Sequence, residues 1–154
     1  AVAGAMIFAE MICYYDSLHL SLWQVLQALY EKYGYYTERS ASVAFGGVDG
    51  MDRMKGIMQK LRDTAFGEIC GVRVEAADDL VTGVRRRADG GTEKIVLPSS
   101  NALKLHLAGG DWICARPSGT EPKLKFYAAA SAKDAESAES RAAEYLAFMK
   151  RFAE

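Results

Sequence analysis

Residues 102–130 read ALKLHLAGGDWICARPSGTEPKLKFYAAA, and this stretch decides the fold. Within it, residues 102–107, 111–116 and 124–130 show the period-two alternation of β-strands that bury one face. Gly109-Gly110-Asp111 marks a turn between the first two strands. Because the strands follow one another without intervening helices, they favour an antiparallel sheet with helices on one face. The stretch therefore predicts an α+β fold.

The pattern continues on the N-terminal side of this stretch. Residues 71–77 alternate in the same way and predict another strand, and residues 40–47 form a short segment rich in strand-forming residues. Between these two segments, residues 48–66 regain helical spacing. The apolar positions of this predicted helix are rich in methionine, which is typical of core filling: Met51, Met54, Ile57, Met58 and Leu61.

The last segment, residues 132–154, predicts a helix rich in alanine and glutamate. Ser131 or Asp134 is suited to cap its first turn. The spacing of the apolar residues gives this helix one buried face: Ala138, Ala142, Tyr145, Leu146 and Met149.

Residues 1–38 differ from the rest because their pattern is wholly helical. Residues 18–33 carry apolar side chains at spacings of three and four, and Gly34 is a good helix stop. Residues 1–15 are apolar at every position except Glu10. A signal peptide would need a basic start, and a membrane span would need about 20 apolar residues. The remaining interpretation is a buried helix, whose neighbours the following residues do not supply. We therefore expect the chain to be a piece of a larger protein.

The composition limits the possible partners. The chain has 154 residues and a formal net charge of −1, so it lacks the basic excess of a dedicated nucleic-acid binder. Its three cysteines, Cys13, Cys70 and Cys114, are odd in number and far apart, which fits neither a zinc knuckle nor a disulfide framework. We expect them to be reduced, mostly buried thiols of a cytoplasmic protein.

The strongest local signal is the loop from Arg116 to Lys123, RPSGTEPK. Its two prolines stiffen the shoulders of the loop, and Gly119 lets the backbone approach a ligand closely. Hydroxyl groups, backbone N–H groups and the guanidinium of Arg116 are all donors suited to phosphate oxygens. Lys125 lies on the same strand face as Lys123 and adds positive charge. This chemistry favours a phosphate site, whereas the plainer alternative is a polar turn in which Arg116 pairs with Glu121.

The string RPSGTEPKLKFY, residues 116–127, resembles the phosphate-binding loop of the α-D-phosphohexomutase superfamily, the phosphoglucomutases and phosphomannomutases. Residues 97–123, LPSSNALKLHLAGGDWICARPSGTEPK, resemble the stretch that leads into that loop. Residues 29–62, LYEKYGYYTERSASVAFGGVDGMDRMKGIMQKLR, resemble the join between the third and fourth domains.

The resemblance implies that residues 1–38 are the last helices of an incomplete third domain. It also implies that residues 39–154 are the C-terminal fourth domain, with a TATA-binding-protein-like antiparallel sheet. The parent would be a cytoplasmic, four-domain intramolecular phosphotransferase that interconverts hexose 1-phosphate and hexose 6-phosphate. A phosphoserine, Mg²⁺ and a hexose 1,6-bisphosphate intermediate would take part.

By position, the phosphate-binding residues implied by the resemblance are Arg116, Ser118, Gly119, Thr120 and Lys125. They would hold the sugar phosphate that is not transferred. No catalytic residue is expected in this chain, because the serine, metal and sugar loops of the family have no counterpart in its sequence. Asp49-Gly50-Met51-Asp52-Arg53 offers two carboxylates, but we expect Asp49 to cap a helix rather than bind Mg²⁺. The isolated chain is therefore predicted to be inactive.

Two other classes of function remain open. The first is a stand-alone, non-catalytic module that binds phosphosugars or other phosphoanions, and the second is an RNA-binding α+β domain. The parent could also be a phosphomannomutase or a phosphopentomutase, because sugar recognition lies outside this chain. We expect no membrane partner and no nucleic-acid partner.

Several weaker signals have plain interpretations. Arg85-Arg86-Arg87 is predicted to lie in a solvated hairpin or loop, and His106 on the exposed face of a strand. His19 and His106 have no partner at metal-ligand spacing. Cys114 is expected in the core, and Trp23 and Trp112 are expected to be packing residues.

Overall fold

The computed structural model describes residues 1–153, which form two compact units. The first unit is Ala1–Tyr35 and the second is Tyr36–Glu154.

The first unit consists of two helices, α1 (Val2–Ser17) and α2 (Leu22–Tyr33). Ser21 caps α2 because its hydroxyl accepts from the amide of Gln24, whose side chain accepts in return from the Ser21 amide. Gly34 ends α2 with a positive φ of 92°. The predicted helices are therefore present, although the second begins at Leu22 rather than near residue 18.

Helix α1 is not buried within this chain. None of its residues is buried, and Met6 and Phe8 expose 68% and 54% of their surface. The expectation of a buried helix is therefore not met by the residues described here. The helix keeps a large apolar surface that the first unit does not cover.

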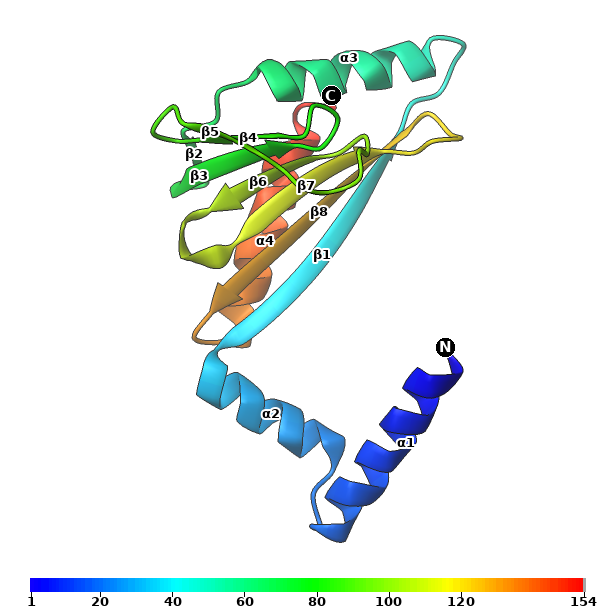
Figure 1. Ribbon diagram of the computed structural model, residues 1–154, viewed down its shortest axis with the longest axis vertical. Helices are drawn as coiled ribbons and strands as arrows, with labels where there is room; N and C mark the ends of the chain where they lie inside the picture. The colour runs from blue at the N-terminus through cyan, green and yellow to red at the C-terminus, as the bar shows by residue number, and fades with distance from the viewer. Residues whose placement is uncertain (154) are drawn as a thin grey trace. The chain divides into compact units, whose positions relative to one another are not determined.

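The second unit is an eight-stranded sheet with two helices (Figure 1). Seven strands follow the order β1-β8-β7-β6-β3-β4-β5, and β2 pairs with β3. The strands are β1 (Tyr35–Ala44), β2 (Glu68–Ile69), β3 (Val72–Asp79), β4 (Val84–Arg87), β5 (Thr92–Lys94), β6 (Leu103–Leu107), β7 (Trp112–Pro117) and β8 (Lys123–Ala132). A short 3₁₀ turn, η1 (Ala108–Gly110), joins β6 to β7.

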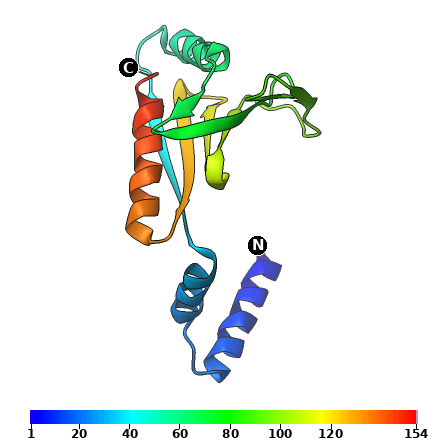
Figure 2. The same cartoon turned by 90° about the vertical axis from the view of Figure 1, so that its left-hand side faces the viewer.

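The antiparallel sheet predicted from residues 102–130 is confirmed. Strand β6 pairs with β7, β7 with β8, and β3 with β6, all antiparallel. Helix α3 (Gly50–Asp63) lies across one end of the strands, and α4 (Ala135–Lys150) covers one face, behind the sheet in Figure 1 and beside it in Figure 2. The fold is the predicted α+β class with flanking helices.

The core follows the period-two pattern. Every second residue of the three central strands is buried against the helices: Leu103, Leu105, Leu107, Ile113, Ala115, Leu124, Phe126, Ala128 and Ala130. The five predicted core residues of α4 are all buried. Of the five predicted in α3, Met54, Met58 and Leu61 are buried, Ile57 is half-buried and Met51 is exposed, so the prediction for Met51 is wrong. Burying one of the larger side chains stabilises the fold by roughly 1.5–3 kcal/mol.

The helix caps agree only in part with the predictions. Asp134 caps α4, where its Oδ1 accepts from the amide of Ser137 at 2.7 Å. Asp49 is the N-terminal flanking residue of α3 but its side chain makes no capping hydrogen bond. The prediction that the Asp49 side chain caps the helix is therefore wrong, although α3 does begin directly after Asp49.

Other expectations need correction. Strand β1 begins at Tyr35, inside the segment predicted to be helical, and β2, β4 and β5 were not predicted as strands. Cys13 and Cys70 are exposed rather than buried. Cys114 is half-buried on the sheet face opposite Ile113 and Ala115, so it is not a core residue.

A buried polar network fixes α4 to the sheet. Asp111, only 3% exposed, accepts hydrogen bonds from the Tyr145 hydroxyl at 2.8 Å and from the Ser131 amide at 2.9 Å. Burial raises the pKa of Tyr145, and the Asp111 carboxylate raises it further, so the phenol remains a donor. Arg141 adds an ion pair at 3.5 Å. The turn before β7, the end of β8 and α4 are therefore held by one carboxylate.

We predict that Asp111→Ala lowers the free energy of unfolding by about 3 kcal/mol, because it leaves buried donors without an acceptor. Urea unfolding followed by the amide resonances of the second unit measures this. Asp52→Ala is the control, since Asp52 is exposed and, within residues 1–153, forms an ion pair with Lys55 alone, so a change within about 0.5 kcal/mol is expected. Equal losses in the two variants would contradict the role of the network.

Candidate functional site

Backbone hydrogen bonds hold both ends of the loop between β7 and β8. The amide of Ser118 donates to the carbonyl of Lys123 at 2.7 Å, and the amide of Lys123 donates to the carbonyl of Glu121 at 2.7 Å. The carbonyl of Pro122 accepts from the amide of Phe45 at 2.8 Å, which ties the loop to the chain entering α3. The tip of the loop, Gly119, Thr120 and Glu121, is exposed.

Close packing near Pro122 explains one glycine of α3. A Cβ at Gly50 would lie 2.3 Å from the carbonyl oxygen of Phe45 and 3.2 Å from the Cβ of Pro122. Only glycine allows the backbone to approach this closely. The start of α3 therefore supports the loop from one side.

Two cations face each other where the loop leaves the sheet. Arg116 on β7 and Lys125 on β8 are direct cross-strand partners, and both are exposed. Within residues 1–153, neither side chain forms a hydrogen bond or an ion pair. Like charges directly opposite each other are destabilising, so this pair carries a cost that nothing in the described chain offsets.

The tip of the loop adds free donors. In the described part of the chain, the amides of Gly119, Thr120 and Glu121 have no acceptor. The carboxylate of Glu121 pairs with Lys123 at 3.4 Å. The alternative in which Arg116 pairs with Glu121 is therefore wrong. Arg116 remains available to a ligand.

The structure brings the five predicted site residues to one end of the sheet. Ser118, Gly119 and Thr120 follow Arg116 after one proline, Pro117, and Lys125 lies opposite Arg116. Backbone amides, hydroxyls, a guanidinium fork and an ammonium together suit the oxygens of a phosphate group. That this loop binds phosphate remains a prediction.

Sequence reasoning missed an ionic cluster on β3, β4 and β6. Arg85 donates to both oxygens of Asp78 at 2.5 and 2.7 Å, and Nε2 of His106 lies 2.9 Å from Oδ2 of Asp78. Burial alone would raise the pKa of Asp78, but hydrogen bonds from Arg85 and His106 outweigh it and hold the pKa below its usual value. Arg85-Arg86-Arg87 does belong to a hairpin, β4–β5, as one alternative predicted. However, Arg85 is bound to a buried carboxylate rather than solvated, and His106 is half-buried rather than exposed.

Lys104 is a second residue that the sequence did not single out. Its ammonium lies 4.6 Å from the centre of the Trp112 ring, a cation–π distance. Both residues lie on the sheet face that the helices do not cover. Trp112 is therefore half-buried at the surface rather than packed in the core.

The donors needed for a resident metal ion do not come together in the described residues. Within residues 1–153, no group of three or more His, Cys, Asp or Glu side chains is arranged to hold one. Asp49 and Asp52 are not part of such a group. Across the described residues 1–153, no helix is both long enough and apolar enough to cross a membrane.

This chain is similar in sequence to proteins of one family. The family model described as "Phosphoglucomutase/phosphomannomutase, C-terminal domain" matches residues 70–147. The chain is 34% identical over 113 residues to a phosphoglucomutase of Staphylococcus saprophyticus, a match that covers 73% of this chain and 20% of that protein. It is 33% identical over 135 residues to a phosphopentomutase of Pongo abelii, covering 82% and 21%.

A solved structure is also similar: the open form of the exocytosis-sensitive phosphoprotein pp63/parafusin, a phosphoglucomutase, from Paramecium. The TM-score is 0.46 at 12% identity, with 86% of this chain and 22% of that chain covered. The chain thus spans about a fifth of the length of the curated relatives that it matches.

The repulsion between Arg116 and Lys125 predicts an anion effect on stability. Arg116→Gln should leave the free energy of unfolding unchanged or raise it by a few tenths of a kcal/mol in low salt, because the like-charge contact is removed. Added phosphate should stabilise the unchanged chain more than this variant. Thermal unfolding with and without phosphate measures both effects. A clear loss of stability in the variant without anion would show that Arg116 serves the fold instead.

The lowered pKa of Asp78 predicts a pH-dependent contribution. It is fully present above the ordinary carboxyl pKa, near 3.9, and is lost as the pH falls through the lower folded value. Asp78→Asn should therefore be clearly less stable than the unchanged chain at pH 7, and the difference should shrink toward pH 3. Urea unfolding at the two pH values measures it. A difference that stays constant would contradict the paired carboxylate.

Proposed function

Because this chain belongs to the phosphoglucomutase/phosphomannomutase family, in which it is the C-terminal domain, we propose that it serves a phosphoglucomutase-type enzyme. The complete enzyme interconverts hexose 1-phosphate and hexose 6-phosphate. In this proposal the described loop grips the phosphate group that is not being transferred. The substrate-phosphate contacts are Arg116, Ser118, Gly119, Thr120 and Lys125.

One observation carries the proposal. The facing cations Arg116 and Lys125 have no counter-charge in the described chain, and they flank three amides that have no acceptor. A dianionic phosphate would supply both the missing negative charge and the missing acceptors, because it neutralises the cation pair and accepts hydrogen bonds from the loop amides. An ordinary polar turn would not need this combination.

Each group has a distinct part in the grip. The guanidinium of Arg116 presents two parallel N–H donors to phosphate oxygens, and Lys125 acts as a point charge from the neighbouring strand. The amides of Gly119 and Thr120 approach a third oxygen, and the hydroxyls of Ser118 and Thr120 adapt to what remains. The site forms no covalent bond. It contributes by positioning the sugar, which lowers the barrier of a transfer that happens elsewhere.

The rest of the enzyme supplies the chemistry. A phosphoserine outside this chain would exchange the phosphoryl group with the sugar by way of a hexose 1,6-bisphosphate. Mg²⁺, whose ligands would also lie outside this chain, would supply charge stabilisation there when bound. Residues 1–35, rather than 1–38, belong to the preceding domain in this proposal, because β1 is part of the sheet of the second unit. The exposed apolar surface of α1 packs in that preceding domain. The enzyme works in the cytoplasm, with phosphosugars and its own other domains as partners.

The loop by itself does not choose the sugar, since its contacts are to phosphate. The phosphopentomutase match extends over 135 residues, more than the 113 of the phosphoglucomutase match. A pentose-phosphate parent is therefore the second candidate. Comparing the two sugar phosphates on the complete enzyme separates them.

We predict that Arg116→Gln weakens binding of hexose 6-phosphate to this chain by about 10- to 100-fold, the loss expected for one or two charge-assisted hydrogen bonds. Isothermal titration calorimetry measures the affinity. Lys133→Gln is the matched control, because Lys133 is exposed in the turn before α4 and away from the loop. Equal affinities in Arg116→Gln and Lys133→Gln would refute the phosphate assignment.

We also predict that the purified 154-residue chain does not convert glucose 1-phosphate, because the transfer chemistry lies in other domains. A coupled assay for glucose 6-phosphate measures turnover. Activity that persists after removal of any full-length enzyme would place catalytic groups in this chain.

A further inference from the structure

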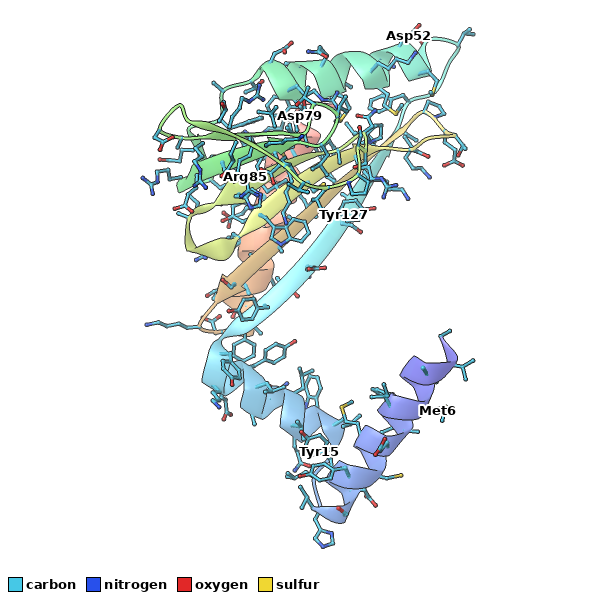
Figure 3. All side chains as sticks on the ribbon, viewed as in Figure 1. Met6, Tyr15, Asp52, Asp79, Arg85 and Tyr127 are labelled. Carbon is cyan, nitrogen blue, oxygen red and sulfur yellow. The ribbon has the colours of Figure 1, made fainter. Side chains whose placement is uncertain are left out.

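The segment that joins β1 to α3 runs beside the β7–β8 loop. Phe45 begins this segment, and its amide donates to the carbonyl of Pro122 at 2.8 Å. Gly50, the first residue of α3, ends the segment. Figure 3 labels Asp52 in the first turn of α3, at the end of the sheet where the loop between β7 and β8 lies. The end of β1, the start of α3 and the loop therefore meet at Pro122.

Gly50 packs against backbone rather than against the far end of a flexible side chain. It is buried, and a Cβ there would lie 2.3 Å from the carbonyl oxygen of Phe45 and 3.2 Å from the Cβ of Pro122. An ordinary van der Waals contact would require one of the two backbones to move by roughly 1 Å. Because Phe45 also holds Pro122 through its amide, such a movement would pass directly to the loop.

Phe45 has little freedom to absorb that movement. Its side chain is 3% exposed and belongs to the same core cluster as Met54 of α3. The guanidinium of Arg53, also on α3, lies 5.6 Å from the centre of the Phe45 ring, a cation–π distance. Helix α3 therefore holds the ring of Phe45 while the amide of the same residue holds Pro122.

The position of Pro122 sets that of the loop tip. The exposed tip, residues 119–121, directly precedes Pro122, and its three amides have no acceptor in the described part of the chain. Lys123 directly follows, and its amide donates to the carbonyl of Glu121 at 2.7 Å. The tip and Pro122 thus belong to one short turn. The hydrogen bond from Phe45 fixes this turn relative to α3.

We propose that Gly50 is a positioning residue for phosphate binding. Because it has no side chain, the first turn of α3 approaches Phe45 and Pro122 closely, and this packing holds the amides of residues 119–121 in the orientation that a phosphate group requires. Gly50 itself does not touch the phosphate. The inference rests on the proposed function of the loop, and it adds the element that keeps the loop preorganised.

The first test compares Gly50→Ala with Gly56→Ala in the complete 154-residue chain. Gly56 lies in the same helix, but it is exposed and a Cβ there would meet no neighbouring atom within 4 Å. Titration with inorganic phosphate is followed by nuclear magnetic resonance on the signals of the folded chain, so a loss of stability does not count as a loss of affinity. Gly50→Ala should bind phosphate about tenfold more weakly, the loss expected for one hydrogen bond to a charged group.

Gly56→Ala should bind phosphate as tightly as the unchanged chain. Equal affinities in Gly50→Ala and Gly56→Ala would overturn the role of Gly50 and leave the loop assignment intact. If the unchanged chain does not bind phosphate at the loop, the proposed function itself fails.

Hydrogen exchange of the unchanged chain gives a second test, which decides the matter even if Gly50→Ala does not fold. If the Phe45 amide holds the loop in its binding form, bound phosphate must in turn stabilise that hydrogen bond, because coupling between two sites is reciprocal. At a phosphate concentration about ten times the Kd, exchange of the Phe45 amide should therefore slow by about tenfold.

The reference for exchange is the amide of Ala88, which donates to the carbonyl of Glu75 at 2.9 Å. Ala88 lines a groove of about 570 Å³ at the other end of α3, beside Arg62 and Arg86. Its exchange rate should not change with phosphate. An unchanged rate at Phe45, or a slowing that Ala88 shares in full, would overturn the inference.

Discussion

The alternation of side chains along β6, β7 and β8 is the constraint from which the rest of the second unit follows. One set of alternate residues, from Leu103 to Ala130, is buried against α3 and α4, and a shift of one residue would expose all of it. That requirement fixes the register of the strands. It also forces the other set onto the uncovered face, whatever its charge. The position of Arg116 opposite Lys125 is thus a consequence of burying Ala115, Leu124 and Phe126.

The buried charges of this sheet have partners, whereas two exposed cations at one end of it do not. Buried carboxylates are fully engaged: Asp78 with Arg85 and His106, Asp79 with Arg62, and Asp111 with Tyr145. These contacts hold the hairpin β4–β5, helix α3 and helix α4 to the central strands. By contrast, Arg116 and Lys125 face each other across two strands, and neither forms an ion pair within residues 1–153. This exposed pair of like charges is the feature on which the proposed anion site rests.

The sequence predicted those elements whose pattern depends only on residues close together in the chain. The buried face of α4, the three central strands and the proline-bounded loop follow from spacing alone, because burial of one face imposes a period of 3.6 or 2. Strands β4 and β5 were missed because their residues are mostly charged, and they are held by Asp78 and other groups distant in sequence. The start of β1 at Tyr35 was missed because the helix pattern ends at Gly34 without a clear strand signal after it. The cation–π contact of Lys104 depends on pairing β6 with β7, which spacing predicts only in outline.

The central claim is that the tip of the β7–β8 loop binds a phosphate group. Amide chemical shifts of the unchanged chain, recorded during titration with inorganic phosphate, test it most directly. The account predicts saturable shifts of the Gly119, Thr120 and Glu121 amides, whose donors have no acceptor among residues 1–153. Amides of the groove beside Arg62 and Arg86 should not move. Shifts confined to that groove, or no saturable shift at the loop, would contradict the account.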